Sequence, residues 1–266
     1  MYKTFYSLSH EPFQKEIETE NLFAWEGFKE AEARLDYLLK TRGIGVLLGE
    51  NGSGKTTVLR AFSEELSSSL YRVVYFPLST GTVMDFYRGL AVGLGEKPRH
   101  RKVDLFHQIQ DAVERFYHDQ KVTPVFILDE MQLAARKFLN DLTILFNFNM
   151  DSQNPFVLIL AGLPLFLDKL KLNQNQALNQ RVVMQYSLDP LSKKEVKEYL
   201  SHQLELAGAN HAIFNPQAVE AIALRTKGIP RLINSIAINS LLLGCQLEAQ
   251  TINEEIVFRA CEDNGL

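Results

Sequence analysis

Residues 49–56 read Gly49-Glu50-Asn51-Gly52-Ser53-Gly54-Lys55-Thr56 and match the pattern G-x-x-x-x-G-K-[ST] in full. They follow an apolar run at residues 44–48 and precede an amphipathic stretch that reaches about residue 69. In such a strand–loop–helix context, the glycines let successive backbone N–H groups face one concavity, and the N-terminus of the helix adds positive potential. The segment therefore predicts a phosphate-binding loop.

Two side chains of this loop have distinct roles toward a nucleoside triphosphate. Lys55 can reach the β- and γ-phosphates, and the hydroxyl of Thr56 can ligate Mg²⁺. We therefore expect ATP and Mg²⁺ as cofactors. The residues expected to bind the nucleotide are Gly49, Glu50, Asn51, Gly52, Ser53, Gly54, Lys55, Thr56 and Thr57.

A second motif lies about seventy residues further along the chain. The apolar residues 125–128 are followed directly by Asp129 and Glu130. In a doubly wound sheet such a strand carries its terminal carboxylates toward the phosphate-binding loop. Asp129 would hold Mg²⁺ through water, and Glu130 would polarise the water that attacks the γ-phosphate. A glutamate at this place predicts ATP hydrolysis rather than nucleotide sensing alone.

Short apolar runs alternate with amphipathic runs as far as Pro190. Five of them are expected to be strands, at residues 44–48, 73–76, 125–128, 156–160 and 182–186. Continuous apolar strands separated by helices indicate an α/β fold with a parallel sheet covered on both faces. Beyond Pro190, helices are expected at residues 192–207, 215–226, 230–244 and 253–262. We therefore expect an α/β core with an aromatic N-terminal segment at residues 1–190 and a small helical lid domain at residues 191–266.

The bulk properties are those of an ordinary globular chain. Of the 266 residues, 46% are hydrophobic and 23% charged. No apolar run approaches the roughly 18 to 20 residues that cross a bilayer, and the N-terminus lacks a secretory signal. The two cysteines, Cys245 and Cys261, have no metal-binding spacing. These features predict a cytoplasmic protein with reduced cysteines and no membrane partner.

Further motifs occur together with the two already described. They are Tyr2-x-x-Phe5-Tyr6-x-Leu8-x-x-x-Pro12-Phe13, Leu128-Asp129-Glu130-Met131-Gln132, Ala161-Gly162-Leu163-Pro164 and Gly228-Ile229-Pro230-Arg231. In this order they resemble the ExeA/GspA-type AAA+ ATPases, from Tyr2 to about residue 245. The resemblance implies a P-loop AAA+ core with a five-stranded parallel sheet, a small α-helical lid, ATPase activity and assembly into a homo-oligomeric ring or filament.

The resemblance also implies roles for two arginines. Arg231 matches the sensor-2 arginine that touches the γ-phosphate, although it could be a solvated arginine at a helix start. Arg181 matches an arginine near the subunit boundary and could act as a trans arginine finger, or it could simply cap a helix C-terminus. Leu163 departs from the family pattern, since a polar sensor-1 side chain is expected near it. Either a neighbouring residue takes over that role or hydrolysis is slow.

One loop between two expected helices is basic. Its candidate DNA-binding residues are Lys97, Arg99, Arg101 and Lys102. Contacts would go mainly to the backbone of duplex DNA. The alternative is a solvated loop balanced by Glu96 and Asp104.

Three functions are compatible with these features. The first is an oligomeric ATPase that binds duplex DNA without sequence preference and assists a transposase, similar to the IstB, TnsC and MuB helpers. The second is an ExeA/GspA-like ATPase of a secretion or cell-envelope assembly system. Full-length members of that branch continue into a membrane helix, whereas this chain stops at Leu266. The third is a nucleotide-gated scaffold that hydrolyses little ATP, which Leu163 would explain.

Overall fold

The computed structural model describes residues 2–14, 17–78 and 82–263. The chain forms two compact units. The helical unit contains residues 1–29, 52–54 and 189–266, and the sheet unit contains residues 30–51 and 55–188. The N-terminal segment, which we expected within the core domain, groups with the helical unit.

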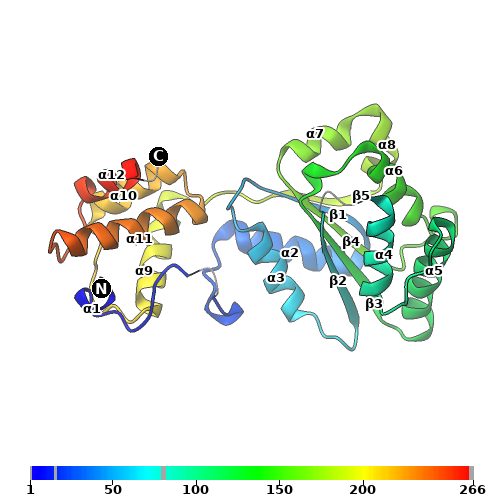
Figure 1. The fold of residues 1–266 in the computed structure, drawn as a ribbon, viewed down its shortest axis with the longest axis horizontal. Helices are drawn as coiled ribbons and strands as arrows, with labels where there is room; N and C mark the ends of the chain where they lie inside the picture. The colour runs from blue at the N-terminus through cyan, green and yellow to red at the C-terminus, as the bar shows by residue number, and fades with distance from the viewer. Residues whose placement is uncertain (1, 15–16, 79–81, 264–266) are drawn as a thin grey trace. The chain divides into compact units, whose positions relative to one another are not determined.

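The sheet unit is built on five parallel strands in the order β2-β3-β4-β1-β5 (Figure 1). Their bounds are Gly43–Leu48 (β1), Tyr71–Pro77 (β2), Thr123–Asp129 (β3), Val157–Gly162 (β4) and Val182–Ser187 (β5). All residues of β1 and β4 are buried, which explains their continuous apolar sequence. The predicted α/β fold with a five-stranded parallel sheet is confirmed.

Helices flank this sheet. Their bounds are Glu26–Thr41 (α2), Lys55–Glu65 (α3), Val83–Gly93 (α4), Lys102–Glu114 (α5), Arg136–Leu145 (α6), Leu165–Lys171 (α7) and Gln176–Gln180 (α8). Short helical turns lie at Arg115–Asp119, Met131–Leu133, Asn149–Asp151 and Asn173–Asn175. A core of apolar side chains, among them Phe126, Phe146 and Phe156, packs between sheet and helices. This packing fixes the carboxyl ends of the strands, where the site residues lie.

The helical unit contains the four helices expected after Pro190. They are Lys193–Leu206 (α9), Pro216–Thr226 (α10), Pro230–Gln246 (α11) and Glu254–Asp263 (α12), and the N-terminal segment adds Tyr2–Phe5 (α1) and a turn at Thr19–Asn21. Ser192 begins α9 with a capping box, and Asn215 caps α10. The aromatic N-terminal residues Tyr6 and Phe13 are buried, and the Tyr6 hydroxyl donates to the carbonyl of Ala249. These aromatic residues are therefore packed in a core.

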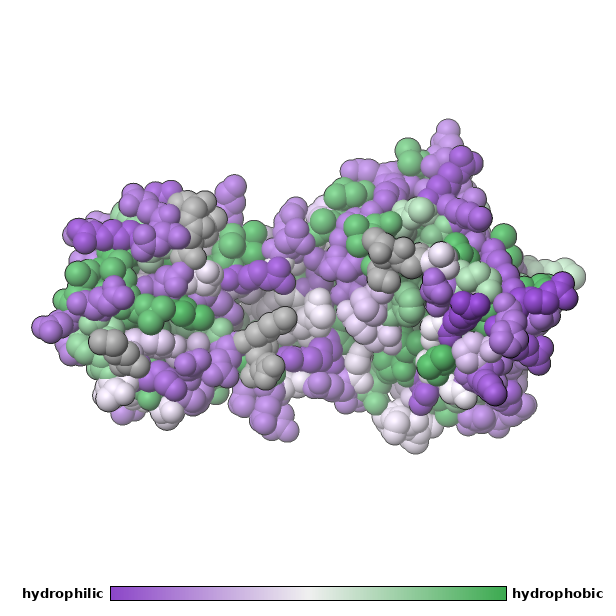
Figure 2. All heavy atoms as spheres, in the orientation of Figure 1, coloured by the Kyte–Doolittle hydropathy of each residue, from purple (hydrophilic) through white to green (hydrophobic). Residues whose placement is uncertain are grey.

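On the face drawn in Figure 2, hydrophilic residues are interspersed with hydrophobic ones. Within residues 2–14, 17–78 and 82–263, no helix combines the length and the apolar character that a bilayer span requires.

Candidate nucleotide-binding site

The phosphate-binding loop joins β1 to α3. Gly49 donates its N–H to the carbonyl of Gly162 at the end of β4, over 3.2 Å. Gly52 and Gly54 have φ angles of +79° and +100°, a region that residues with a Cβ rarely adopt. Helix α3 starts at Lys55, so its first N–H groups face the loop as the sequence predicts.

The side chain of Lys55 folds back over this loop. Its Nζ atom donates to the carbonyl oxygens of Gly49 at 2.7 Å and Glu50 at 3.0 Å. The ammonium group is thus held beside the loop. It lies within reach of phosphate oxygens that the backbone N–H groups of the loop would bind.

The two sequence motifs meet at Asp129. The hydroxyl of Thr56 lies 3.3 Å from Asp129 Oδ2, and Glu130 N–H donates to Oδ1 at 2.8 Å. Asp129 is only 3% exposed. A hydroxyl beside a buried carboxylate supplies the oxygen ligands that Mg²⁺ prefers, so these residues fit the ion. In the described part of the chain, no group of three or more His, Cys, Asp or Glu residues is placed to hold a metal ion.

Tyr75 is a third partner of Asp129 that the sequence did not reveal. Its hydroxyl donates to Oδ2 from the neighbouring strand β2, over 3.2 Å. Burial, followed by the charge of Asp129 and this hydrogen bond, raises the pKa of Tyr75 to about 12. A tyrosine hydroxyl is protonated at neutral pH even at its ordinary pKa of about 10, and the raised pKa extends this state to higher pH. The only signal in the sequence was a polar-tipped residue near the end of a strand.

Glu130 follows β3 with left-handed backbone angles, φ 61° and ψ 33°. Such a conformation is unfavourable for a residue with a long side chain and recurs at functional sites. It turns the chain into the short helix at Met131–Leu133, and the exposed Glu130 carboxylate accepts a hydrogen bond from the amide of Gln132.

Two residues of the helical unit pack against glycines of the phosphate-binding loop. Arg231, in the first turn of α11, donates its backbone N–H to the carbonyl of Gly52 at 3.3 Å. A Cβ at Gly52 would lie 2.6 Å from that of Arg231, and one at Gly54 would lie 2.8 Å from the ring of Trp25. Gly52, Gly54, Trp25 and Arg231 all belong to the helical unit, and the role of Arg231 as a sensor of the γ-phosphate stays a prediction.

Arg181 is held within the sheet unit. Its guanidinium group donates to the carbonyl oxygens of Thr143 and Phe146 at the end of α6 and forms an ion pair with Asp151 at 2.8 Å. The side chain is 14% exposed. These contacts agree with the second of our two hypotheses, in which Arg181 caps a helix C-terminus. To act as a trans arginine finger, the side chain would first have to break them.

The backbone of the basic loop makes two hydrogen bonds with one buried side chain. Buried Gln108 accepts from the N–H of Arg99 and donates to the carbonyl of Lys97. The side chains of Lys97, Arg99 and Arg101 are exposed. Lys102 differs, because its ammonium group pairs with the buried Asp141.

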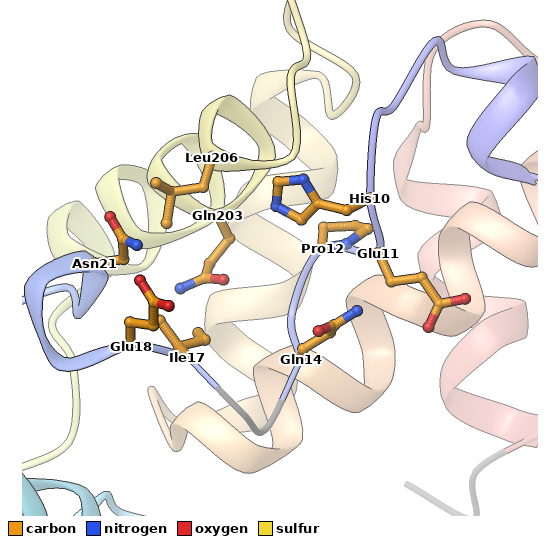
Figure 3. A pocket seen from close by; sticks show the side chains of 9 residues that line it. All are labelled: His10, Glu11, Pro12, Gln14, Ile17, Glu18, Asn21, Gln203 and Leu206. Atoms are coloured by element: carbon orange, nitrogen blue, oxygen red, sulfur yellow. The ribbon is translucent and has the colours of Figure 1, made fainter.

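A pocket of about 300 Å³ lies in the helical unit, and none of the residues that line it belongs to either motif (Figure 3). It is lined by His10, Glu11, Pro12, Gln14, Ile17, Glu18, Asn21, Gln203 and Leu206. Its lining mixes carboxylate, amide and apolar groups and shows no single ligand chemistry.

Comparison with known proteins identifies the family. A family model described as an AAA domain matches residues 38–170. General secretion pathway protein A of Aeromonas hydrophila is 32% identical over 271 residues, a match that covers 100% of this chain and 49% of the relative. This chain thus spans about half the length of that relative.

Two solved structures share the fold. Cdc6p from Pyrobaculum aerophilum matches with a TM-score of 0.69 at 17% identity, over 98% of this chain and 70% of that chain. ORC2 from Aeropyrum pernix, solved as ADPNP-ADP complexes, matches with a TM-score of 0.68 at 17% identity, over 95% and 70% of the two chains. The chain belongs to the AAA domain family, and its resemblance to the ExeA/GspA-type AAA+ ATPases is confirmed.

Proposed function

We propose that this protein binds and hydrolyses Mg²⁺-ATP at the loop of residues 49–56. The observation that carries the proposal is the meeting of Thr56 and Asp129 beside the start of α3, with Glu130 next to them. Membership of the AAA domain family supports nucleotide binding. Hydrolysis is inferred from the glutamate.

We assign each side chain of the site a separate role in binding or hydrolysis. The loop N–H groups and Lys55 would bind the phosphates, and Thr56 and Asp129 would hold the metal ion. Mg²⁺ would neutralise charge on the phosphate oxygens when it is bound. Glu130 would orient a water molecule and accept its proton, which a carboxylate next to the metal ligands can do without leaving its strand end. Arg231 would add positive charge near the loop.

For the cellular role, we propose an ExeA/GspA-like ATPase of a secretion or envelope-assembly system that works as a homo-oligomer. The support is the 32% identity to a secretion pathway protein, which extends over the whole of this chain and 49% of that relative. Our first expectation, a helper of a transposase, gains no support from that relative, and we do not carry it forward. The relative is about twice as long as this chain. We therefore propose for this chain only the ATPase role, and none of the functions of the part of the relative that lies outside the match.

The ATPase proposal is tested by measuring phosphate release and the binding of a fluorescent ATP analogue in the presence of Mg²⁺. Lys55→Ala should weaken binding by about 2 to 3 kcal/mol, roughly 30- to 150-fold in Kd, because charge-assisted hydrogen bonds to the phosphates are lost. Lys40→Ala is the matched control, since Lys40 is an exposed lysine on α2. Equal affinity in the wild type and Lys55→Ala would remove the site from residues 49–56.

A further inference from the structure

The side chain of Gln132 forms hydrogen bonds both to Glu130, the proposed base, and to the backbone of Leu163, which follows β4. Its Nε2 donates to Oε2 of Glu130, and its Oε1 accepts the N–H of Leu163 at 3.1 Å. Both polar ends of the amide are therefore engaged, one by the carboxylate and one by the backbone. An amide bound at both ends has one orientation, because a flip would set donor against donor.

The backbone around Gln132 is hydrogen-bonded to helix α7. Lys169 of α7 donates to the carbonyl oxygens of Gln132 and Ala134, which ties the short helix to α7. Gly162, at the end of β4, lies so close that a Cβ there would come within 3.0 Å of Gln132 Oε1. The amide oxygen thus lies close to Gly162; Gln132 is partly exposed, whereas Glu130 is exposed.

An exposed glutamate side chain samples several rotamers unless a partner restrains it. The hydrogen bond from Gln132 supplies such a restraint on one carboxylate oxygen. Within the described residues the other oxygen, Oε1, accepts no hydrogen bond and can take one from water.

We propose that Gln132 is a positioning residue that holds the Glu130 carboxylate ready for the attacking water. The inference rests on the proposed ATPase function. It also addresses Leu163, whose side chain offers no polar group: the backbone N–H of Leu163 anchors the amide, and the amide acts on the base. Gln132 itself is not assigned a contact with the nucleotide.

The first test is Gln132→Met, which keeps the length of the side chain and removes both hydrogen bonds. A well-positioned base contributes roughly 10²- to 10⁴-fold to a rate, so kcat should fall at least about tenfold. KM for ATP and the Kd of a fluorescent ATP analogue should stay within about twofold, since the nucleotide contacts are intact. Gln120→Met, at an exposed glutamine, is the matched control.

A second variant separates positioning from folding. Gln132→Glu keeps an oxygen acceptor for the Leu163 N–H but offers Glu130 a like charge in place of a donor. Because Glu130 is exposed, the repulsion should lower the melting temperature by only a few degrees, yet kcat should fall at least as far as in the methionine variant. A rate equal to or above that of the wild type in this variant would overturn the proposal.

The decisive measurement is the double variant with Glu130→Gln. If Gln132 acts through Glu130, Gln132→Met should lower kcat much less in the Glu130→Gln background than in the wild type. An equal fold-loss in both backgrounds means that Gln132 acts on the fold or elsewhere, and the proposal fails. Wild type measured alongside separates the two claims: no phosphate release from it refutes both, whereas release that Gln132→Met leaves unchanged refutes only this one.

Discussion

The hydroxyl of Thr56 lies 3.3 Å from the Oδ2 atom of Asp129, which is 73 residues further along the chain. This proximity requires β1 and β3 to end at the same edge of the sheet, separated by β4. The parallel order of the strands thus delivers a hydroxyl from the start of a helix and a carboxylate from the end of a strand to one place. Neither segment forms the site alone.

Glu130→Gln should bind ATP as the wild type does and release phosphate roughly 10²- to 10⁴-fold more slowly, because the amide cannot accept the proton of the water. Binding of a fluorescent ATP analogue and the rate of phosphate release measure the two properties. Glu248→Gln is a matched control, since Glu248 is exposed and also has a positive φ, 56°. Undiminished turnover would exclude Glu130 as the base.

Arg181→Ala should lower the free energy of unfolding by about 1 to 3 kcal/mol, because two carbonyl groups at the end of α6 lose a charged donor. Arg136→Ala, at an exposed arginine of the same helix, should have little effect. Denaturant unfolding measures both. If Arg181→Ala leaves stability unchanged but abolishes phosphate release by an otherwise intact oligomer, the arginine-finger role gains support instead.

Lys102→Ala should destabilise the sheet unit. It removes the cation that pairs with Asp141, whose side chain is 8% exposed, and leaves the hydroxyl of Tyr87 beside the carboxylate. Because the lysine itself is 44% exposed, the expected loss is limited to about 1 to 2 kcal/mol. Lys97→Ala, at an exposed lysine of the loop that precedes α5, is the control in thermal unfolding. Equal stability of the two variants would show that the pair contributes nothing.

Charge reversal of Arg99 and Arg101 tests whether the basic loop binds duplex DNA. If it does, the double Glu variant should bind plain duplex more weakly, and the slope of log K against log salt should fall by about two. Fluorescence anisotropy at several salt concentrations measures both quantities. Lys102 is left unchanged because it pairs with Asp141, so a charge reversal at Lys102 would alter stability as well as any binding of DNA. Identical curves for variant and wild type would assign the loop to a solvated surface.

Tyr199 provides a prediction for the dependence of stability on pH. Burial raises its pKa from 10.0 to about 12, and its hydroxyl donates to Asn234 Oδ1 at 2.6 Å. The folded state therefore keeps a proton that the unfolded chain releases, so this contribution to stability is complete below pH 10 and is lost as the pH rises through 12. Tyr199→Phe should flatten the decline between these pH values.

Denaturant unfolding across this alkaline range measures the effect. Tyr37→Phe is the control, since Tyr37 is 56% exposed. A decline of the same steepness in Tyr199→Phe and the wild type would contradict the assignment.

The strands and helix starts could be predicted from short sequence patterns, because burial and capping act on neighbouring residues of the chain. Fully buried parallel strands must be apolar along their whole length, so residues 44–48 and 125–128 could be identified without knowledge of their neighbours. The helix starts at Ser192 and Asn215 could be predicted because each side chain accepts a hydrogen bond from the backbone N–H three residues later.

The missed features depend on pairs that are distant in sequence. Tyr75 reaches Asp129 only because β2 and β3 are neighbours, and Lys102 reaches Asp141 only after α5 and α6 have packed. Composition gave no sign of either pair. The grouping of the first 29 residues with the helical unit is of the same kind, since it arises from contacts with the last third of the chain.

At Glu130 the left-handed backbone favours a residue such as glycine, whereas the proposed chemistry requires a carboxylate. Glycine and asparagine adopt that conformation at lower cost than glutamate, yet neither can replace its carboxylate. Selection for resistance to heat would favour such replacements, and selection for turnover would oppose them. At residue 130 the chain therefore carries a conformational cost at the position where a carboxylate follows the end of β3.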